Sequence, residues 1–243
     1  MSTVNFVGVK CYSQYIVNDW DYTDMALPHL IEPNEKDWIF KVTEETSLQP
    51  IRDVCLLAYF LAAPCTTLEI NRIQIRDVLH KSGKLNKKFT IRGTTSYNGD
   101  DRVIFLKNKR LVEFTKSYIQ YRIKNNIGMG NHPDHYLGLD PDEPLFFTNK
   151  GTGFSIVSKK TDKGSPTYSC DALNRHLKAL MGKAGIECPS VLSGRRTFAV
   201  TLKRKGYDVA HIHHLLGNKS LTTTTKLLTT DPVDMGAIAA EAF

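Results

Sequence analysis

The spacing of apolar residues predicts that the first part of the chain is helical. Residues 34–46 have the apolar spacing of an amphipathic helix. Residues 51–63 (IRDVCLLAYFLAA) are apolar nearly all round, which is typical of a helix at the centre of a core. Pro64 interrupts this helix, and Thr66 or Thr67 can then cap a further short helix.

Alternation of apolar and polar residues predicts strands after this helical region. Two or three strands are expected, over residues 73–79, 88–92 and 102–106. The turn sequence Asn98-Gly99-Asp100 lies between the last two, so these strands are expected to form a hairpin. A helix is expected over residues 108–125, followed by a mostly loop-like stretch at 128–164 with a short extended piece at 145–148.

The C-terminal third returns to helical spacing. Gly206 and Gly217 are placed to end two of its helices, and Asp208 and Ser220 to begin two. The expected helices cover residues 171–183, 195–205, 209–216 and 221–228. Helices, a small antiparallel sheet and further helices together predict an α+β fold that is mostly helical.

Charge is distributed unevenly along the chain. The formal net charge is +7, yet residues 1–50 carry eight acidic and three basic side chains, a balance of −5. The rest of the chain has a balance of +12, which favours a polyanionic partner such as nucleic acid. A surface that is basic only for solubility remains the alternative.

Several classes of protein are disfavoured by what the sequence lacks. The longest apolar run, residues 54–63, is too short to span a membrane, and no signal-peptide pattern opens the chain. Five scattered cysteines without a CxxC pair argue against a thiolate zinc site, and no GxxxxGK[ST] loop is present. We therefore expect a soluble, cytoplasmic and nucleoid-associated protein without cofactor or metal.

Residues 193–228, SGRRTFAVTLKRKGYDVAHIHHLLGNKSLTTTTKLL, resemble the catalytic core of the tyrosine recombinases, which include the phage integrases. Upstream, residues 52–78 resemble the family's stretch around its first catalytic Arg, and residues 87–106 its hairpin with the catalytic Lys. The resemblance spans about 34–230. It divides the chain into an arm (1–33), a recombinase-like DNA-binding domain (34–230) and a tail (231–243), possibly exchanged between subunits.

The resemblance also implies where the family's catalytic groups would lie. This family cleaves DNA with a Tyr nucleophile, two Arg that hold the phosphate, and Lys and His that move protons. The first Arg corresponds to Thr66, and the Lys to Thr94 or Thr95. The His and second Arg of the family's His-x-x-Arg correspond to Leu192 and Arg195. The His after "LLG" corresponds to Asn218, and the Tyr to Leu227. Arg195 alone keeps the family's residue.

The missing nucleophile does not depend on the alignment. No Tyr follows Tyr207, so the helices expected over residues 209–228 cannot supply one. A threonine hydroxyl of Thr222–Thr225 would be a poor nucleophile without a base beside it. We therefore expect a catalytically inactive relative rather than an enzyme.

The basic residues of the matched regions are the candidate DNA contacts, since lysine and arginine bind phosphates. Asn174 could contact a base edge through its amide, although a plain surface residue is the alternative. One group is Arg195, Arg196, Lys203, Arg204, Lys205, Asn218, Lys219 and Lys226. A second is Arg72, Arg76, Lys81, Lys84, Lys87, Lys88 and Arg92, and a third is Asn174, Arg175 and Lys178. A solvated helix face is the alternative for the first group.

Three histidines, His211, His213 and His214, invite a metal-site interpretation, but their spacing does not place all three on one helical face.

The leading hypothesis is a non-catalytic, sequence-specific binder of double-stranded DNA. It would serve a mobile element as a partition (centromere-binding) protein or a transcriptional regulator, as a homodimer or higher assembly, possibly with a second protein encoded nearby. The alternatives are a recombinase with displaced catalytic residues and an inactive partner of an active recombinase.

Overall fold

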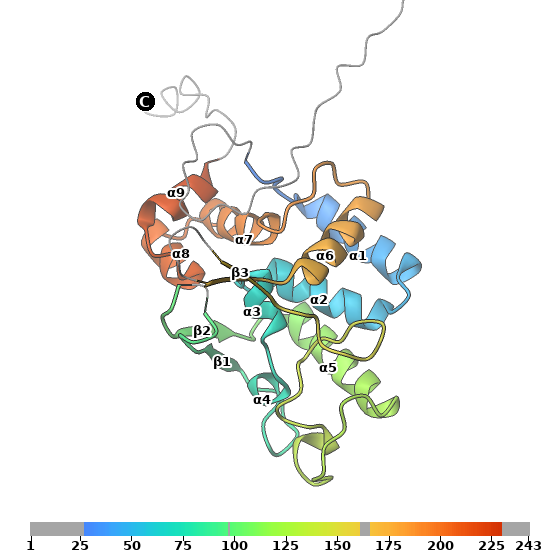
Figure 1. Cartoon of the computed structure of the whole chain (residues 1–243). Helices are drawn as coiled ribbons and strands as arrows, with labels where there is room; N and C mark the ends of the chain where they lie inside the picture. The colour runs from blue at the N-terminus through green and yellow to red at the C-terminus, as the bar shows by residue number, and fades with distance from the viewer. Residues whose placement is uncertain (1–26, 97, 161–165, 230–243) are drawn as a thin grey trace, which may run out of the picture.

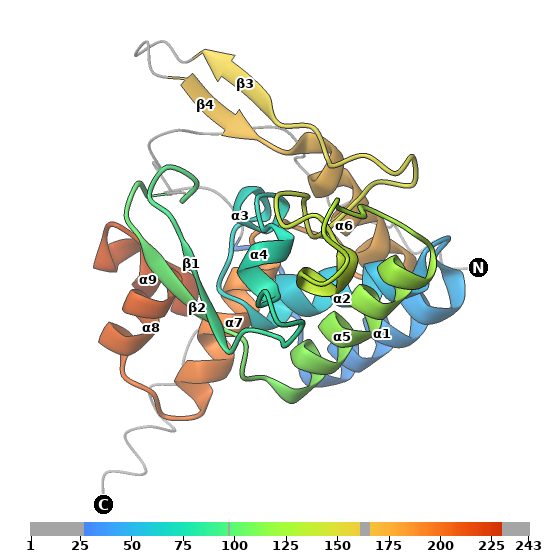
Figure 2. The same cartoon turned by 90° about the horizontal axis from the view of Figure 1, so that it is seen from below.

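The structure, a computed structural model, describes residues 27–96, 98–160 and 166–229. Helices form most of its regular secondary structure, with two small hairpins at the edges (Figures 1 and 2). The body contains α1 (Pro33–Thr46), α2 (Pro50–Ala62), α3 (Thr67–Asn71), α4 (Ile75–Val78), α5 (Lys109–Lys124) and α6 (Asp171–Lys183). On one side lie α7 (Ser193–Arg204), α8 (Val209–Leu216) and α9 (Leu221–Leu228).

Helix α2 lies at the centre of the core, as predicted from its apolar sequence. Its residues from Arg52 to Leu61 are all buried, and it packs against α1, α5 and α7. Tyr59 meets Phe146 edge-on at a ring distance of 5.5 Å, and Phe146 stacks on Tyr118 of α5. A helix buried on every side fixes the positions of its neighbours, including α7.

The first hairpin is the predicted one. Strands β1 (Lys88–Ile91) and β2 (Arg102–Phe105) pair antiparallel, with Ile91 opposite Arg102. Successive side chains alternate between the two faces, so Phe89, Ile91 and Ile104 are buried while Phe105 is exposed.

One strand predicted for the middle of the chain is wrong. The strand expected over 73–79 is a turn of helix, α4, because Asp77 accepts a hydrogen bond from the Gln74 amide at 2.8 Å and caps the turn. The short extended piece expected at 145–148 is present as an isolated bridge between Phe147 and Gly153.

The stretch expected to be loop, 128–164, contains a short 3-10 turn and the first strand of a second hairpin. Strands β3 (Val157–Lys160) and β4 (Pro166–Ser169) pair antiparallel, and the 3-10 turn η1 covers Tyr136–Gly138. Figure 2 shows the β3–β4 hairpin standing away from the body. No residue of β4 is fully buried, so its sequence has no alternation of apolar and polar positions.

The helices of the C-terminal third are confirmed within two residues of their expected bounds. Ala199, Ile212, Leu216 and Leu227 form a second small core where α7, α8 and α9 meet. Gly217 ends α8 in the left-handed region, with φ of 64°.

The α+β architecture is confirmed, while the proposed division into arm, domain and tail stays a prediction. Residues 27–32 precede α1 and pack on α7, where the Ile31 amide donates to Thr197 Oγ1 at 3.0 Å. The rest of the expected arm and the tail at 231–243 lie outside the described residues. In the described part of the chain, no helix is long and apolar enough to cross a membrane.

Candidate nucleic-acid interface

Five of the six positions that the resemblance assigns to catalytic groups line one hollow, of about 380 Å³. They are Thr66, Leu192, Arg195, Asn218 and Leu227, which come from four separate parts of the sequence. We call this hollow the α7–α9 pocket. Its remaining walls are Leu27, Pro28, Ser220, Thr222, Thr223 and Lys226.

Arg195 is held on the wall of this pocket by backbone oxygens. Its side chain is only 4% exposed and donates to the Pro64 carbonyl at 2.9 Å and the Leu216 carbonyl at 2.9 Å. It also donates to Asn218 Oδ1 at 2.7 Å, and the Asn218 amide nitrogen donates to Thr224 at 2.9 Å. The guanidinium group therefore fixes the corner between α8 and α9 as well as facing the pocket.

A second buried arginine, Arg102, lies beside Arg195 and shares its acceptors. Arg102 of β2 donates to the same two carbonyls, Pro64 at 2.6 Å and Leu216 at 3.0 Å. Its charge is balanced by Glu69, whose carboxylate lies 2.6 Å away. Sequence reasoning missed Arg102, although strand alternation with the inward Ile104 places it on the buried face.

The β1–β2 hairpin is attached to the end of α8 at a second point. The Asn98 side-chain amide donates to the Gly217 carbonyl at 2.8 Å. Gly217 packs so closely on Arg102 that an added Cβ would lie 2.5 Å from Arg102 Cδ. The hairpin and the three C-terminal helices are thus joined around one set of carbonyl groups.

The other lining positions that the resemblance assigns to catalytic groups carry structural or apolar side chains. Thr66 caps α3, accepting from the Glu69 amide at 3.2 Å. The neighbouring Cys65 is no thiolate nucleophile, because burial raises its pKa to about 12. Among the described lining residues only Arg195 and Lys226 carry charge, and none is a carboxylate or a histidine.

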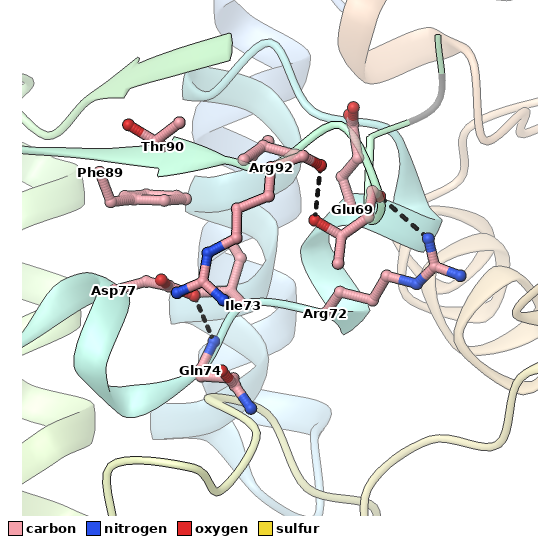
Figure 3. A pocket seen from close by; sticks show the side chains of 10 residues that line it. Glu69, Arg72, Ile73, Gln74, Asp77, Phe89, Thr90 and Arg92 are labelled. Carbon is pink, nitrogen blue, oxygen red and sulfur yellow. Dashed lines mark hydrogen bonds between the residues drawn. The ribbon is translucent and has the colours of Figure 1, made fainter. Parts of the chain in front are cut away.

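Thr95, one of the two positions expected for the catalytic Lys, does not line the α7–α9 pocket. It lies at a separate hollow of about 40 Å³ between α3, α4 and β1 (Figure 3). There its carbonyl accepts from Arg72 at 3.0 Å. Figure 3 shows the Arg92 side chain extending toward Asp77, while Arg72 extends the other way. Burial raises the pKa of Asp77, although Arg92 and Arg76 partly oppose this.

The first group of predicted DNA contacts is divided by the structure. Arg196 is buried, and it donates to the carbonyls of Pro28 and Thr229. Arg204 forms an exposed two-pronged ion pair with Glu32, at 2.6 and 2.9 Å, which lowers the pKa of Glu32. Lys203, Lys205, Lys219 and Lys226 are exposed. A buried Arg196 does not present the phosphate-facing cation that we expected from the sequence.

The second group lies mainly around the β1–β2 hairpin. Arg72 stacks on Tyr168 at 5.6 Å, and Arg76 pairs with Asp142. The remaining members are exposed: Lys81, Lys84, Lys87, Lys88 and Arg92.

In the third group, Arg175 of α6 is exposed and Lys178 is partly exposed. Asn174 differs, because its Oδ1 is buried and lacks a hydrogen-bond partner among the described residues. A two-pronged contact with adenine needs both amide atoms, so Asn174 does not present one in this conformation.

The histidines of α8 do not converge on one point. His213 bonds to Thr224 at 2.9 Å, while His211 and His214 are exposed. Within the described residues, no cluster of three or more His, Cys, Asp or Glu side chains is arranged to hold a metal ion.

At the level of sequence, the chain matches no protein-family model and no curated protein. Solved structures do match. XerA recombinase superposes with a TM-score of 0.63 at 18% identity, covering 90% of this chain and 67% of XerA. The fold is that of the tyrosine recombinases.

Two structures with the tyrosine-recombinase fold were solved on DNA. XerH recombinase bound to its palindromic difH substrate matches with a TM-score of 0.62 at 17% identity, covering 93% of this chain and 56% of XerH. A lambda integrase dimer bound to a core site matches with a TM-score of 0.54 at 12% identity, covering 87% of this chain and 52% of lambda integrase. The chain thus spans about half to two thirds of these proteins.

Proposed function

We propose that the chain binds double-stranded DNA and leaves both strands intact. The convergence of five catalytic positions on the α7–α9 pocket carries this proposal, because only Arg195 among them has the family's side chain. A phosphate could be held there without being cleaved. The known complexes of XerH and lambda integrase with DNA support duplex DNA as the ligand.

The exposed cations give this surface its affinity for the DNA backbone. Lys219 and Lys226 flank the α7–α9 pocket, and Lys87, Lys88 and Arg92 extend the positive surface along β1. The start of α9 offers backbone amides to a phosphate, beside the Ser220 cap. Each cation that neutralises a phosphate releases counterions and makes binding depend on salt.

The biological role that fits this proposal is that of a DNA-binding protein encoded by a mobile genetic element. A protein that marks a DNA site without cutting it suits partition at a centromere-like site or control of transcription. Recognition of a repeated or palindromic site would need a homodimer or a higher assembly. Any motor for partition would be a second protein, since this sequence has no phosphate-binding loop.

The decisive experiment is a binding titration over a range of salt concentrations. The probes are duplex fragments from the protein's own locus, with random duplex as competitor. Lys219→Ala should lower the slope of log K against log salt by about one, for every sequence alike. The control is Lys124→Ala, an exposed lysine at the end of α5, on the opposite side of the body from α9 (Figure 1). Equal loss in both variants would show that α9 does not face DNA.

Arg195→Ala should also weaken binding uniformly, as loss of a phosphate contact does. Because Arg195 also joins Pro64, Leu216 and Asn218, the loss of binding in Arg195→Ala must be corrected for the fraction of folded protein.

A recombinase with displaced catalytic residues is the competing function. A covalent protein–DNA adduct on a nicked suicide substrate would establish that function and overturn the proposal. Failure of every fragment to outcompete random duplex would indicate a protein partner instead.

A further inference from the structure

A second hollow, of about 260 Å³, lies on another face of α7. Its floor is apolar and is built by α1, α2, α5 and α7, through Phe40, Leu61, Leu111, Phe198 and Leu202. Three cations stand at its rim: Lys36 of α1, Arg110 of α5 and Lys205 at the end of α7. We call this hollow the cationic groove.

The rim cations lie close enough to affect one another. Partial burial lowers the pKa of Lys36, and the nearby charges of Lys205 and Arg110 lower it further, while Asp37 acts against them. Arg110 stacks on Phe40 at 4.6 Å and pairs with Asp37 at 2.7 Å, in an exposed position. With Arg110 already paired with Asp37, the rim still keeps a net positive charge over an apolar floor, which favours an occupant that is both acidic and apolar.

We propose that the cationic groove binds an acidic, aromatic segment of this same chain, residues 12–25. This segment has three carboxylates, Asp19, Asp21 and Asp24, and no lysine or arginine. It also has four aromatic side chains, Tyr12, Tyr15, Trp20 and Tyr22. The carboxylates are opposite in sign to the rim cations, and the rings match the apolar floor.

The segment is long enough to reach the groove of its own molecule. The described chain begins at Leu27, and the Pro28 carbonyl accepts from Arg196 on α7. Helix α7 has 12 residues, so its length is about 18 Å. The carboxylate farthest from Leu27, that of Asp19, lies eight residues along the chain, so extended chain can carry it up to about 26 Å, more than the length of α7.

This assignment gives Lys205 a different ligand from the one expected by sequence. Phe198, Thr201, Leu202 and Lys205 have the spacing of one helix face, and all four line the groove. Arg195 lines the α7–α9 pocket instead. Lys205 therefore binds carboxylates of the chain itself, not DNA phosphates.

Tryptophan fluorescence tests this directly in the full chain. Trp20 and Trp38 are the two tryptophans, and Trp38 is exposed, with its ring 5.9 Å from Lys41 Nζ. In a Trp38→Phe background, Trp20 should emit at shorter wavelength than in a synthetic peptide of residues 12–26. Lys205→Glu should move the emission to that of the peptide. Lys203→Glu, two residues away on another face of α7, should leave it unchanged.

A reciprocal variant keeps the test valid if Lys205→Glu disturbs folding. Replacing Asp19, Asp21 and Asp24 by Asn leaves the described body intact and should move the Trp20 emission in the same way. If Trp20 in the Trp38→Phe protein emits at the same wavelength as Trp20 in the peptide, the proposal is overturned. Equal shifts in Lys203→Glu and Lys205→Glu, or a signal lost on dilution, would overturn it as well.

Discussion

The α7–α9 pocket and the cationic groove border the same helix but use positive charge in opposite ways. In the pocket, the Arg195 guanidinium is buried and binds the carbonyls of Pro64 and Leu216. In the groove, Lys36, Arg110 and Lys205 stand at the rim above an apolar floor. A run of basic residues in sequence therefore does not define one basic surface, because a helix distributes it around its axis.

The chemistry of the two cations explains the division. Arginine has five donors in a planar fork and can satisfy several carbonyl groups at once, whereas the lysine ammonium is compact and strongly hydrated. Among the described residues, buried arginines are Arg52, Arg102, Arg122, Arg195 and Arg196, and no lysine is buried. The lysines are thus the better guide to the charged surface of this protein.

The largest expected effect is on the buried pair behind the pocket. Glu69→Gln leaves Arg102 buried without its counter-charge and should lower the free energy of unfolding by about 3–5 kcal/mol. The matched control at the groove is Asp37→Asn, which breaks the exposed pair with Arg110 and should cost about 0–1 kcal/mol. Urea denaturation measures both, and similar losses would remove the distinction between the two regions.

The next largest effect is expected at Asp53, which pairs with the buried guanidinium of Arg52, and this effect on stability depends on pH. Burial alone would raise the pKa of Asp53, but hydrogen bonds from His176, Arg52 and Ser47 outweigh it and lower the pKa. Asp53 therefore stabilises the fold above its unfolded pKa of about 3.9, and this contribution is lost as pH falls through the folded pKa. Asp53→Asn should cost about 2–3 kcal/mol at pH 7.

The difference in unfolding free energy between wild type and Asp53→Asn should shrink in acid. Denaturation series between pH 7 and pH 2 measure this difference. A constant difference across that range would mean that the Asp53 carboxylate is not the stabilising form.

A smaller effect is expected where Gly217 meets Arg102. Gly217→Ala places a side chain at positive φ, which costs about 1–2 kcal/mol, and also presses on Arg102 Cδ. Gly206→Ala is the control, because Gly206 has φ of 84° but open space around it. Thermal unfolding should rank Gly217→Ala as the more damaging change. Equal losses would show that the contact with Arg102 is not tight.

The last prediction is that one variant, Leu227→Tyr, gains no DNA-cleaving activity. Leu227→Tyr restores a tyrosine at the position of the family's nucleophile, yet Thr66, Leu192 and Asn218 still lack the family's side chains. No cleavage is expected, as measured by nicking of supercoiled DNA and by adducts on a suicide substrate. Nicking by this variant would mean that other residues supply the missing groups.

Local signals in the sequence predicted most of the helices and the first hairpin. The buried helix α2, the caps at Asp208 and Ser220, and the turn at Asn98-Gly99 all depend on residues close together in the chain. The strand expected over 73–79 was wrong because its alternation also suits one helical turn with Ile75 and Val78 buried. The β3–β4 hairpin was missed because it covers no core.

For the candidate site, the sequence indicated which positions meet but not which side chains are buried or paired. The resemblance selected five positions that meet in the α7–α9 pocket, although they are distant in sequence. The burial of Arg196, the pair of Arg102 with Glu69 and the groove around Lys36 depend on contacts between remote segments. Composition and local spacing do not specify such contacts.

The shared carbonyl of Pro64 has a consequence for the order of folding. It receives Arg102 from 38 residues away and Arg195 from 131 residues away. Contacts of such long range form late, after the local helices. During synthesis, the body from α1 to α6 is made before α7 and α8 emerge, so Arg102 then lacks its acceptors on α8. We expect the N-terminal fragment to remain incompletely packed until the last helices arrive, so that the chain folds as one cooperative unit.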